Sequence, residues 1–100
     1  MRLIVSPAAE ADIVAARSWY EKQRAGLGTE FLAEVSSAMD AVQYEPLRFP
    51  AVHRSFRRAL IHRFPYGLFF VVSREKVVVV AVLHLARDPR HMRKRQISRT

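Results

Sequence analysis

Residues 64–84 read FPYGLFFVVSREKVVVVAVLH and form the longest apolar part of the chain. This stretch contains two runs of β-branched and aromatic residues, which favour strands. A transmembrane helix needs about 20 predominantly apolar residues, and the charged residues 74–76 interrupt the middle of the stretch. The pattern therefore predicts two antiparallel strands, at 65–73 and 76–84, joined by a short turn. Residues 77–83 are apolar on both faces, as in a central strand covered on both sides.

A first strand and a first helix are predicted at the N-terminus. Residues 2–5, RLIV, are short and apolar, as expected for a strand. The pair Ser6-Pro7 then provides a helix N-cap followed by a proline at the first helical position. Apolar residues recur at spacings of three and four as far as about Arg24, which predicts an amphipathic helix.

A second helix is predicted to fold back on the first. Gly26 and Gly28 supply the backbone freedom that ends the first helix, and Thr29 is placed to cap the second. Apolar residues continue at helical spacing until Pro46 blocks further helix. Each helix is expected to have one apolar face, so the two form a hairpin that needs a cover.

The second half of the chain supplies that cover. Residues 47–55 are predicted to be an irregular connection, and residues 55–64 to form a further strand. A length of 100 residues suits one core, so we expect a single domain over residues 1–100. The predicted class is α+β: an N-terminal strand, then a two-helix hairpin packed on an antiparallel sheet that three C-terminal strands complete, then a short basic tail or helix.

The charge is distributed unevenly along the chain. The formal net charge is +8; residues 1–53 hold five Arg and Lys against seven Asp and Glu, whereas residues 54–100 hold twelve against two. A one-sided positive field attracts nucleic acid, ribosomes or an acidic protein by long-range electrostatics. Charge by itself does not choose among these partners.

Several classes of protein and of site are not supported. The chain has no cysteine, which removes disulfides and thiolate metal sites and fits a reducing cytoplasm. The N-terminus is too short of apolar residues for a signal peptide, and no membrane association is expected. His53, His62 and His91 show no metal-ligand spacing. No metal and no other cofactor is predicted.

Three motifs together carry a family resemblance. They are the pair Arg57-Arg58, the residues FPY at 64–66, and HLARDPRHMRKR at 84–95. Combined with the order of elements, they make nearly the whole chain similar to the RelE/ParE superfamily of toxins from type II toxin-antitoxin systems. Where many relatives carry tryptophan in the tail, this chain has Met92.

The resemblance implies a toxin that arrests bacterial growth when it is freed from its antitoxin, by one of two routes. RelE-like members cleave messenger RNA on the ribosome, which requires a proton acceptor, a proton donor and cations. Lysines of the second strand and a tyrosine near the C-terminus help to supply these roles in those members. Here that strand offers arginines, and no tyrosine follows Tyr66. These departures favour the ParE-like branch, whose members bind and inhibit DNA gyrase.

Candidate site residues follow from the same motifs. A nuclease would draw on Arg58, Arg63, His84 and Arg87. Binding of the target or of the antitoxin would draw on Arg57, Arg58, Arg87, Arg90, Arg93, Lys94 and Arg95.

Each candidate also has a purely structural interpretation. Neighbouring side chains on a strand alternate between faces, so only one of Arg57 and Arg58 can join a given site. Either one could instead pair with an acid such as Glu34 or Asp40. A histidine at a strand end, such as His84, is usually packed and hydrogen-bonded to the backbone.

The expected partners are a cognate acidic antitoxin, which would form a hetero-oligomer with the toxin, and a target that is either DNA gyrase or the ribosome with its messenger RNA. A third reading is a basic nucleic-acid-binding module unrelated to toxicity.

Overall fold

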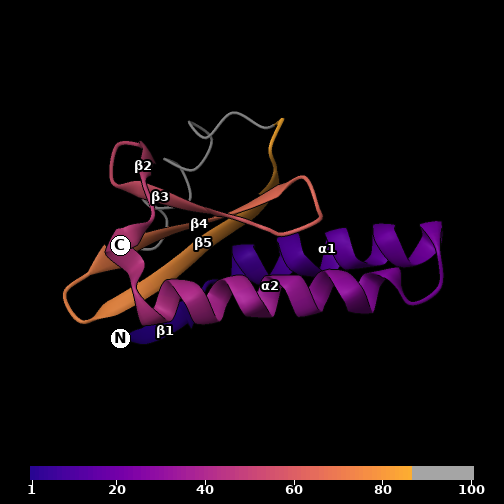
Figure 1. Ribbon diagram of the computed structural model, residues 1–100, viewed down its shortest axis with the longest axis horizontal. Coiled ribbons are helices and arrows are strands. Elements are labelled where there is room, and N and C mark those ends of the chain that lie inside the picture. The colour runs from indigo at the N-terminus through magenta and orange to yellow at the C-terminus, as the bar shows by residue number, and fades with distance from the viewer. Residues whose placement is uncertain (87–100) are drawn as a thin grey trace.

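The computed structural model describes residues 1–86, and its elements follow the predicted order (Figure 1). None of the helices in this part of the chain is long and apolar enough to cross a membrane. The elements are β1 (Arg2–Val5), α1 (Pro7–Gln23), α2 (Leu27–Tyr44), the 3-10 turn η1 (Pro46–Arg48), β2 (Ala51–His53), β3 (Phe56–Leu60), β4 (Tyr66–Ser73) and β5 (Lys76–His84).

The strands form one five-stranded sheet in the order β1-β5-β4-β3-β2. The strands of the second half pair antiparallel, as predicted. β1 runs parallel to β5, pairing Arg2–Val5 with Lys76–Val79, so the sheet is mixed. β5 therefore lies between two strands, as its apolar sequence predicted.

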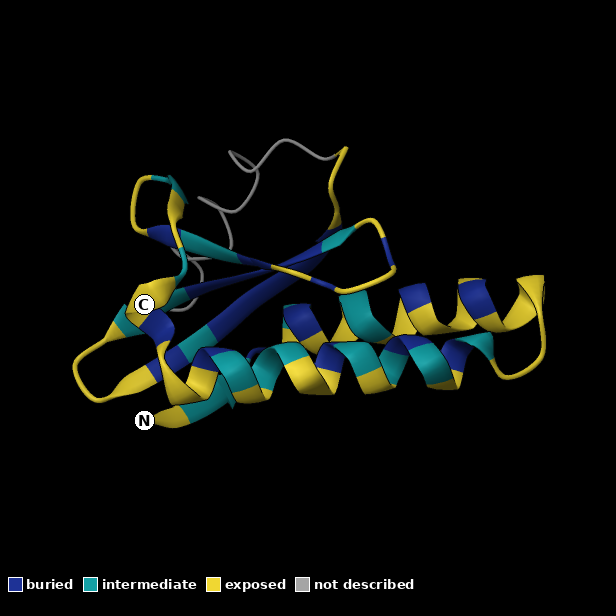
Figure 2. Cartoon of the chain, in the orientation of Figure 1, coloured by how far each residue is buried: buried dark blue, intermediate teal, exposed yellow. Residues whose placement is uncertain are grey.

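The two helices lie side by side on one face of the sheet (Figure 1). Buried and exposed residues alternate along both helices (Figure 2), and the buried ones pack with residues of the strands in one core. This layer holds the larger apolar core, in which Phe31 from α2, Phe70 from β4 and Val79 from β5 have no exposed surface. Burial of side chains of this size stabilises a fold by roughly 1.5–3 kcal/mol each.

The opposite face of the sheet carries a second apolar cluster. It contains Phe56, Phe69, Val80, Ala81 and Leu83, each at most 5% exposed. β5 is thus buried on both faces, as its continuous apolar run predicted.

A β-bulge interrupts the regular alternation of β5. Phe69 pairs with Ala81 and Phe70 with Val79, so Val80 is an extra residue in the ladder. Val80 and Ala81 consequently both face the second cluster, and Val82 returns to the helix side.

The turn between the helices differs from the prediction that Thr29 caps the second helix. The N-cap of α2 is Gly26, in the left-handed region at φ 89°. The Glu21 carboxylate accepts hydrogen bonds from the N–H groups of Gly26 and Gly28, both at 2.9 Å. These bonds lower the pKa of Glu21 below its ordinary value. The carboxylate of Glu21 on α1 thus caps the start of α2, the role that was expected of the Thr29 hydroxyl.

The connection after α2 is more ordered than predicted. Residues 47–55, expected to be irregular, contain part of η1 and all of β2. The following strand is shorter than its predicted span of 55–64. It ends at Leu60. One further cross-strand bond joins Ile61 N–H to the Tyr66 carbonyl, and the chain turns through Arg63, which has a left-handed φ of 72°.

Candidate functional site

Arg57 and Arg58 lie on opposite faces of the sheet, as strand alternation predicted. Arg57 is on the helix side, and its guanidinium donates a hydrogen bond to the carbonyl of Phe49. Arg58 lies on the other side, where its stem passes over Gly67: a Cβ built there would sit 3.0 Å from Arg58 Cδ. The suggested pairing of either arginine with Glu34 or Asp40 is absent among the ion pairs of residues 1–86.

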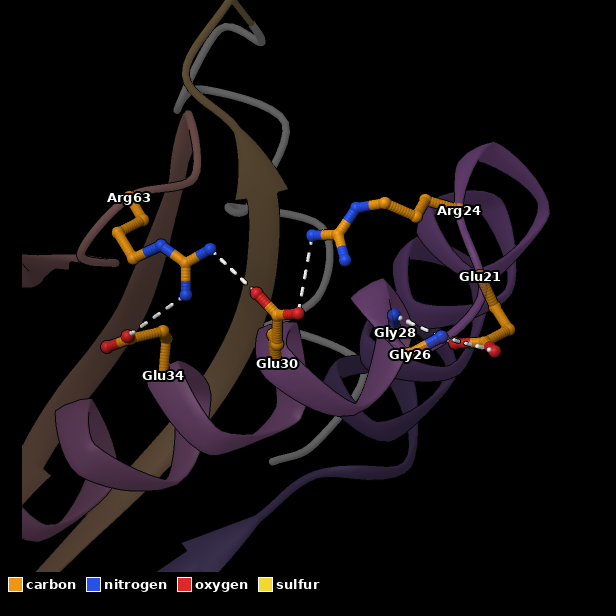
Figure 3. A network of polar contacts seen from close by, with 7 residues as sticks. All are labelled: Glu21, Arg24, Gly26, Gly28, Glu30, Glu34 and Arg63. Carbon is orange, nitrogen blue, oxygen red and sulfur yellow. Dashed lines mark hydrogen bonds and ion pairs between the residues drawn. The ribbon is translucent and has the colours of Figure 1, made fainter.

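Arg63 instead forms ion pairs with Glu34 and with Glu30, one turn earlier on α2 (Figure 3). Arg63 reaches from the β3–β4 connection, with guanidinium nitrogens 2.7 Å from Glu30 and 4.0 Å from Glu34. Arg24 also contacts Glu30, at 3.3 Å. The hydrogen bond from Arg63 holds the pKa of Glu30 below its ordinary value and raises the pKa of Arg63. Arg63 thus joins the sheet to α2.

His84 stands at the end of β5 and is exposed. The predicted backbone hydrogen bond is present, because Nδ1 accepts from the N–H of Ala86 at 3.1 Å. The imidazole also meets the ring of Tyr66, its partner in the β4–β5 ladder, edge to face with centroids 5.5 Å apart. His84 is therefore an ordered, accessible group rather than a buried one.

Three of the nuclease candidates, Arg58, Arg63 and His84, lie among the described residues, and the fold places them apart. His84 pairs with Tyr66, which packs into the helix-side core, so both side chains face the helices. Arg58 faces the other side, and Arg63 is held by acids of α2. The remaining nuclease and binding candidates lie outside the described residues: Arg87, Arg90, Arg93, Lys94 and Arg95. His91, Met92 and the expected terminal helix also lie outside them.

The structure also forms a groove that the sequence did not indicate. It runs between α1 and the end of β5, lined by Asp12, Ala15, Ala16, Trp19, Tyr66, Val82, Leu83 and His84. A second hollow adjoins it, between Trp19, Tyr20, Pro65, Tyr66 and His84. Trp19 is 56% exposed and packs edge-on against Tyr20. The sequence feature that could have indicated this groove is Trp19, a large apolar residue that lies next to the buried face of α1 and not on it.

A carboxylate closes one end of this groove. Asp12 of α1 accepts a hydrogen bond from the backbone N–H of Val82 at 3.0 Å. β1 stops pairing with β5 at Val79, so β1 offers no acceptor to the edge of β5 at this position. Asp12 supplies one from the helix instead.

The histidines of the described residues are dispersed. His53 stacks on Phe56, and His62 Nδ1 lies 3.6 Å from a carboxylate oxygen of Glu34. Within residues 1–86, no three His, Asp or Glu side chains are grouped as ligands for a metal ion.

Comparison with known proteins agrees with this architecture. No curated protein matches the chain. A solved structure titled "Chromosomal ParDE TA system from P. aeruginosa" is similar in fold, with a TM-score of 0.76 and 16% sequence identity over 84% of this chain and 95% of that one. A family model described as the ParE toxin of the type II toxin-antitoxin system parDE matches residues 3–89. The chain therefore belongs to the ParE toxin family of type II toxin-antitoxin systems.

Proposed function

We propose that this ParE-family toxin arrests growth in the bacterial cytoplasm by binding and inhibiting DNA gyrase, without cutting nucleic acid. Its cognate antitoxin, an acidic protein, holds it in a hetero-oligomer until it is released. Family membership supports the toxin and its antitoxin partner; the target is the step that we add.

The observation that carries the proposal is the separation of Arg58 from His84. Cleavage of an RNA backbone by its 2′-hydroxyl needs an acid, a base and a cation around one phosphate. Arg58 and His84 face opposite sides of the sheet, which disfavours their joint contact with one phosphate. Arg63 already forms ion pairs with two carboxylates of α2. The described candidates thus suit binding better than proton transfer.

A binding inhibitor needs charge and shape where it touches its target. The strongest concentration of charge in the sequence follows β5, with five Arg and Lys between Arg87 and Arg95. Arginine suits such a contact because its planar fork binds carboxylates and phosphates with two hydrogen bonds. We propose that Arg87, Arg90, Arg93, Lys94 and Arg95 supply contacts to gyrase.

The test compares both targets with the same purified toxin. Supercoiling by purified gyrase is measured in one arm, and cleavage of messenger RNA on programmed ribosomes in the other. We expect lost supercoiling and intact messenger, with supercoiling restored by a stoichiometric amount of antitoxin. Cut messenger with unaffected gyrase would assign the toxin to the ribosome. Activity in neither arm, with tight binding to any nucleic acid, would favour the basic binding module.

A further inference from the structure

We infer that the groove between α1 and the end of β5 is where the antitoxin docks an extended, uncharged segment, with one large apolar side chain seated against Trp19 and Tyr66. The inference rests on the antitoxin partnership that family membership implies, and it does not depend on gyrase being the target.

The first step is the open edge of β5. β1 covers this edge only from Lys76 to Val79, and the chain then turns into α1. Beyond the bulge at Val80, the stretch of β5 from Ala81 to His84 has no β1 residue beside it. An uncovered strand edge presents backbone donors and acceptors that an extended peptide can pair with.

The backbone groups of His84 point to that edge. Leu85 N–H bonds to the Pro65 carbonyl on the β4 side, and Tyr66 C=O accepts from Ile61 on the β3 side. Residues along an antiparallel ladder alternate in the direction of their backbone groups, so those of His84 face away from β4. Val82 obeys the same alternation, because its N–H points outward to Asp12. Asp12 thus covers one outward position of the edge, and His84 is the next.

The walls of the groove select the occupant. Ala15 and Ala16 form a shallow side on α1, and Trp19 and Tyr66 form an aromatic end. A half-exposed tryptophan over a hollow is the kind of site that accepts one large apolar side chain from a partner. Small side chains on the helix leave room for a backbone to pass beside the strand.

Charge complementarity favours a neutral peptide over nucleic acid. Among the described residues that line the groove and its adjoining hollow, none is Arg or Lys. Nucleic-acid binding depends on basic side chains that neutralise phosphates. The basic part of the chain, after residue 86, is where an acidic segment would be attracted. We therefore assign the apolar part of the antitoxin to the groove, and we expect its acidic residues to contact the basic segment after residue 86.

The test uses a matched pair of substitutions. Ala15→Arg fills the groove with a long side chain, whereas Ala33→Arg makes the same change at an exposed position of α2 outside it. Both variants add one positive charge, so electrostatic attraction of the acidic antitoxin changes equally. Titration calorimetry with full-length cognate antitoxin should show about tenfold or more weakening for Ala15→Arg and for Trp19→Ala, the size expected when a central contact is lost. Ala33→Arg should stay within about twofold of the unmodified chain.

Backbone pairing is tested independently of affinity. Hydrogen exchange of the His84 amide should slow in the antitoxin complex of the unmodified chain, because a new strand would protect it. Equal affinities of Ala15→Arg and Ala33→Arg would overturn the inference. So would a His84 amide that exchanges as fast in the complex as in the free toxin. If Trp19→Ala instead impairs binding of a single-stranded oligonucleotide and spares the antitoxin, the groove belongs to nucleic acid. Failure to inhibit gyrase, with these results intact, would remove only the proposed target.

Discussion

The guanidinium of Arg63 and the carboxylate of Glu30 lie 2.7 Å apart, joining the β3–β4 connection to α2. Both side chains are partly exposed, so the pair is screened by salt. We expect Arg63→Gln and Glu30→Gln each to lower the melting temperature, and the double variant to lower it by less than the sum. A double-mutant cycle at low and high salt measures the coupling, which should shrink as salt is added. If the two substitutions lower the melting temperature additively at low salt, Arg63 and Glu30 do not stabilise each other.

Acid should destabilise the fold through two carboxylates. The pKa of Glu21 is lowered by hydrogen bonds from Gly26 and Gly28, and that of Glu30 mainly by Arg63, both from an ordinary 4.5. A depressed pKa means that the unfolded chain binds more protons, so the stabilisation is complete above the ordinary value and is lost as pH falls through the folded one.

Melting temperatures measured between about pH 3 and 7 should show this loss. The variant that combines Glu21→Gln with Glu30→Gln should melt lower at neutral pH and depend less steeply on acid. An unchanged slope in the double variant would mean that other groups cause the acid sensitivity.

The helix hairpin should tolerate alanine at Gly26 better than at Gly28. A Cβ at Gly28 would lie 2.8 Å from the carbonyl oxygen of Arg17 and 2.9 Å from Glu21 Oε1, so backbone must shift. We expect Gly28→Ala to cost about 1–3 kcal/mol, as overpacking does. Gly26 has open space around it and carries only its left-handed φ, which costs about 1–2 kcal/mol for alanine. Urea unfolding ranks the two, and the reverse order would contradict the close packing at Gly28.

Removing the carboxylate of Asp12 should expose the edge of β5. The N–H of Val82 would lose its acceptor, and an unsatisfied donor that is partly buried costs about 1–3 kcal/mol. Hydrogen exchange of the Val82 amide should speed up in Asp12→Ala. Asp12→Asn, which keeps an oxygen acceptor, should protect this amide better than alanine does. Equal exchange in all three chains would show that the amide is protected in another way.

Growth arrest should depend on basic side chains and not on the imidazole of His84. His84→Gln retains hydrogen-bonding capacity but removes the titratable ring, and this site is exposed, so the fold should persist. We expect this variant to remain toxic, whereas Arg87→Ala and neutralisation of residues 90–95 should relieve arrest. Colony counts after induction, with folding checked by circular dichroism, give the answer. If the folded His84→Gln variant is not toxic while Arg87→Ala remains toxic, the result would contradict a binding inhibitor and favour cleavage of messenger RNA.

Local signals in the sequence predicted the order of the main elements, the helix hairpin and the interior position of β5, but neither η1 nor β2. Ser6-Pro7 starts a helix whatever surrounds it, Pro46 ends one, and a run such as Val77–Leu83 can be satisfied only by burial on both faces. The opposite orientation of Arg57 and Arg58 also followed, because alternation is a property of the strand.

The contacts between residues far apart in the chain could not be predicted from local patterns. The bulge at Val80 depends on the ladder with β4, and uniform valines carry no register of their own. The parallel pairing of β1 with β5 ends at the pair Val5 and Val79, because the chain then turns into α1, and this leaves an edge for Asp12 to reach. The groove beside Trp19, and the separation of Arg58 from His84 by the sheet, arise from packing between elements far apart in the chain. Periodicity reports which side of an element is buried, and it contains no information about which partner covers that side.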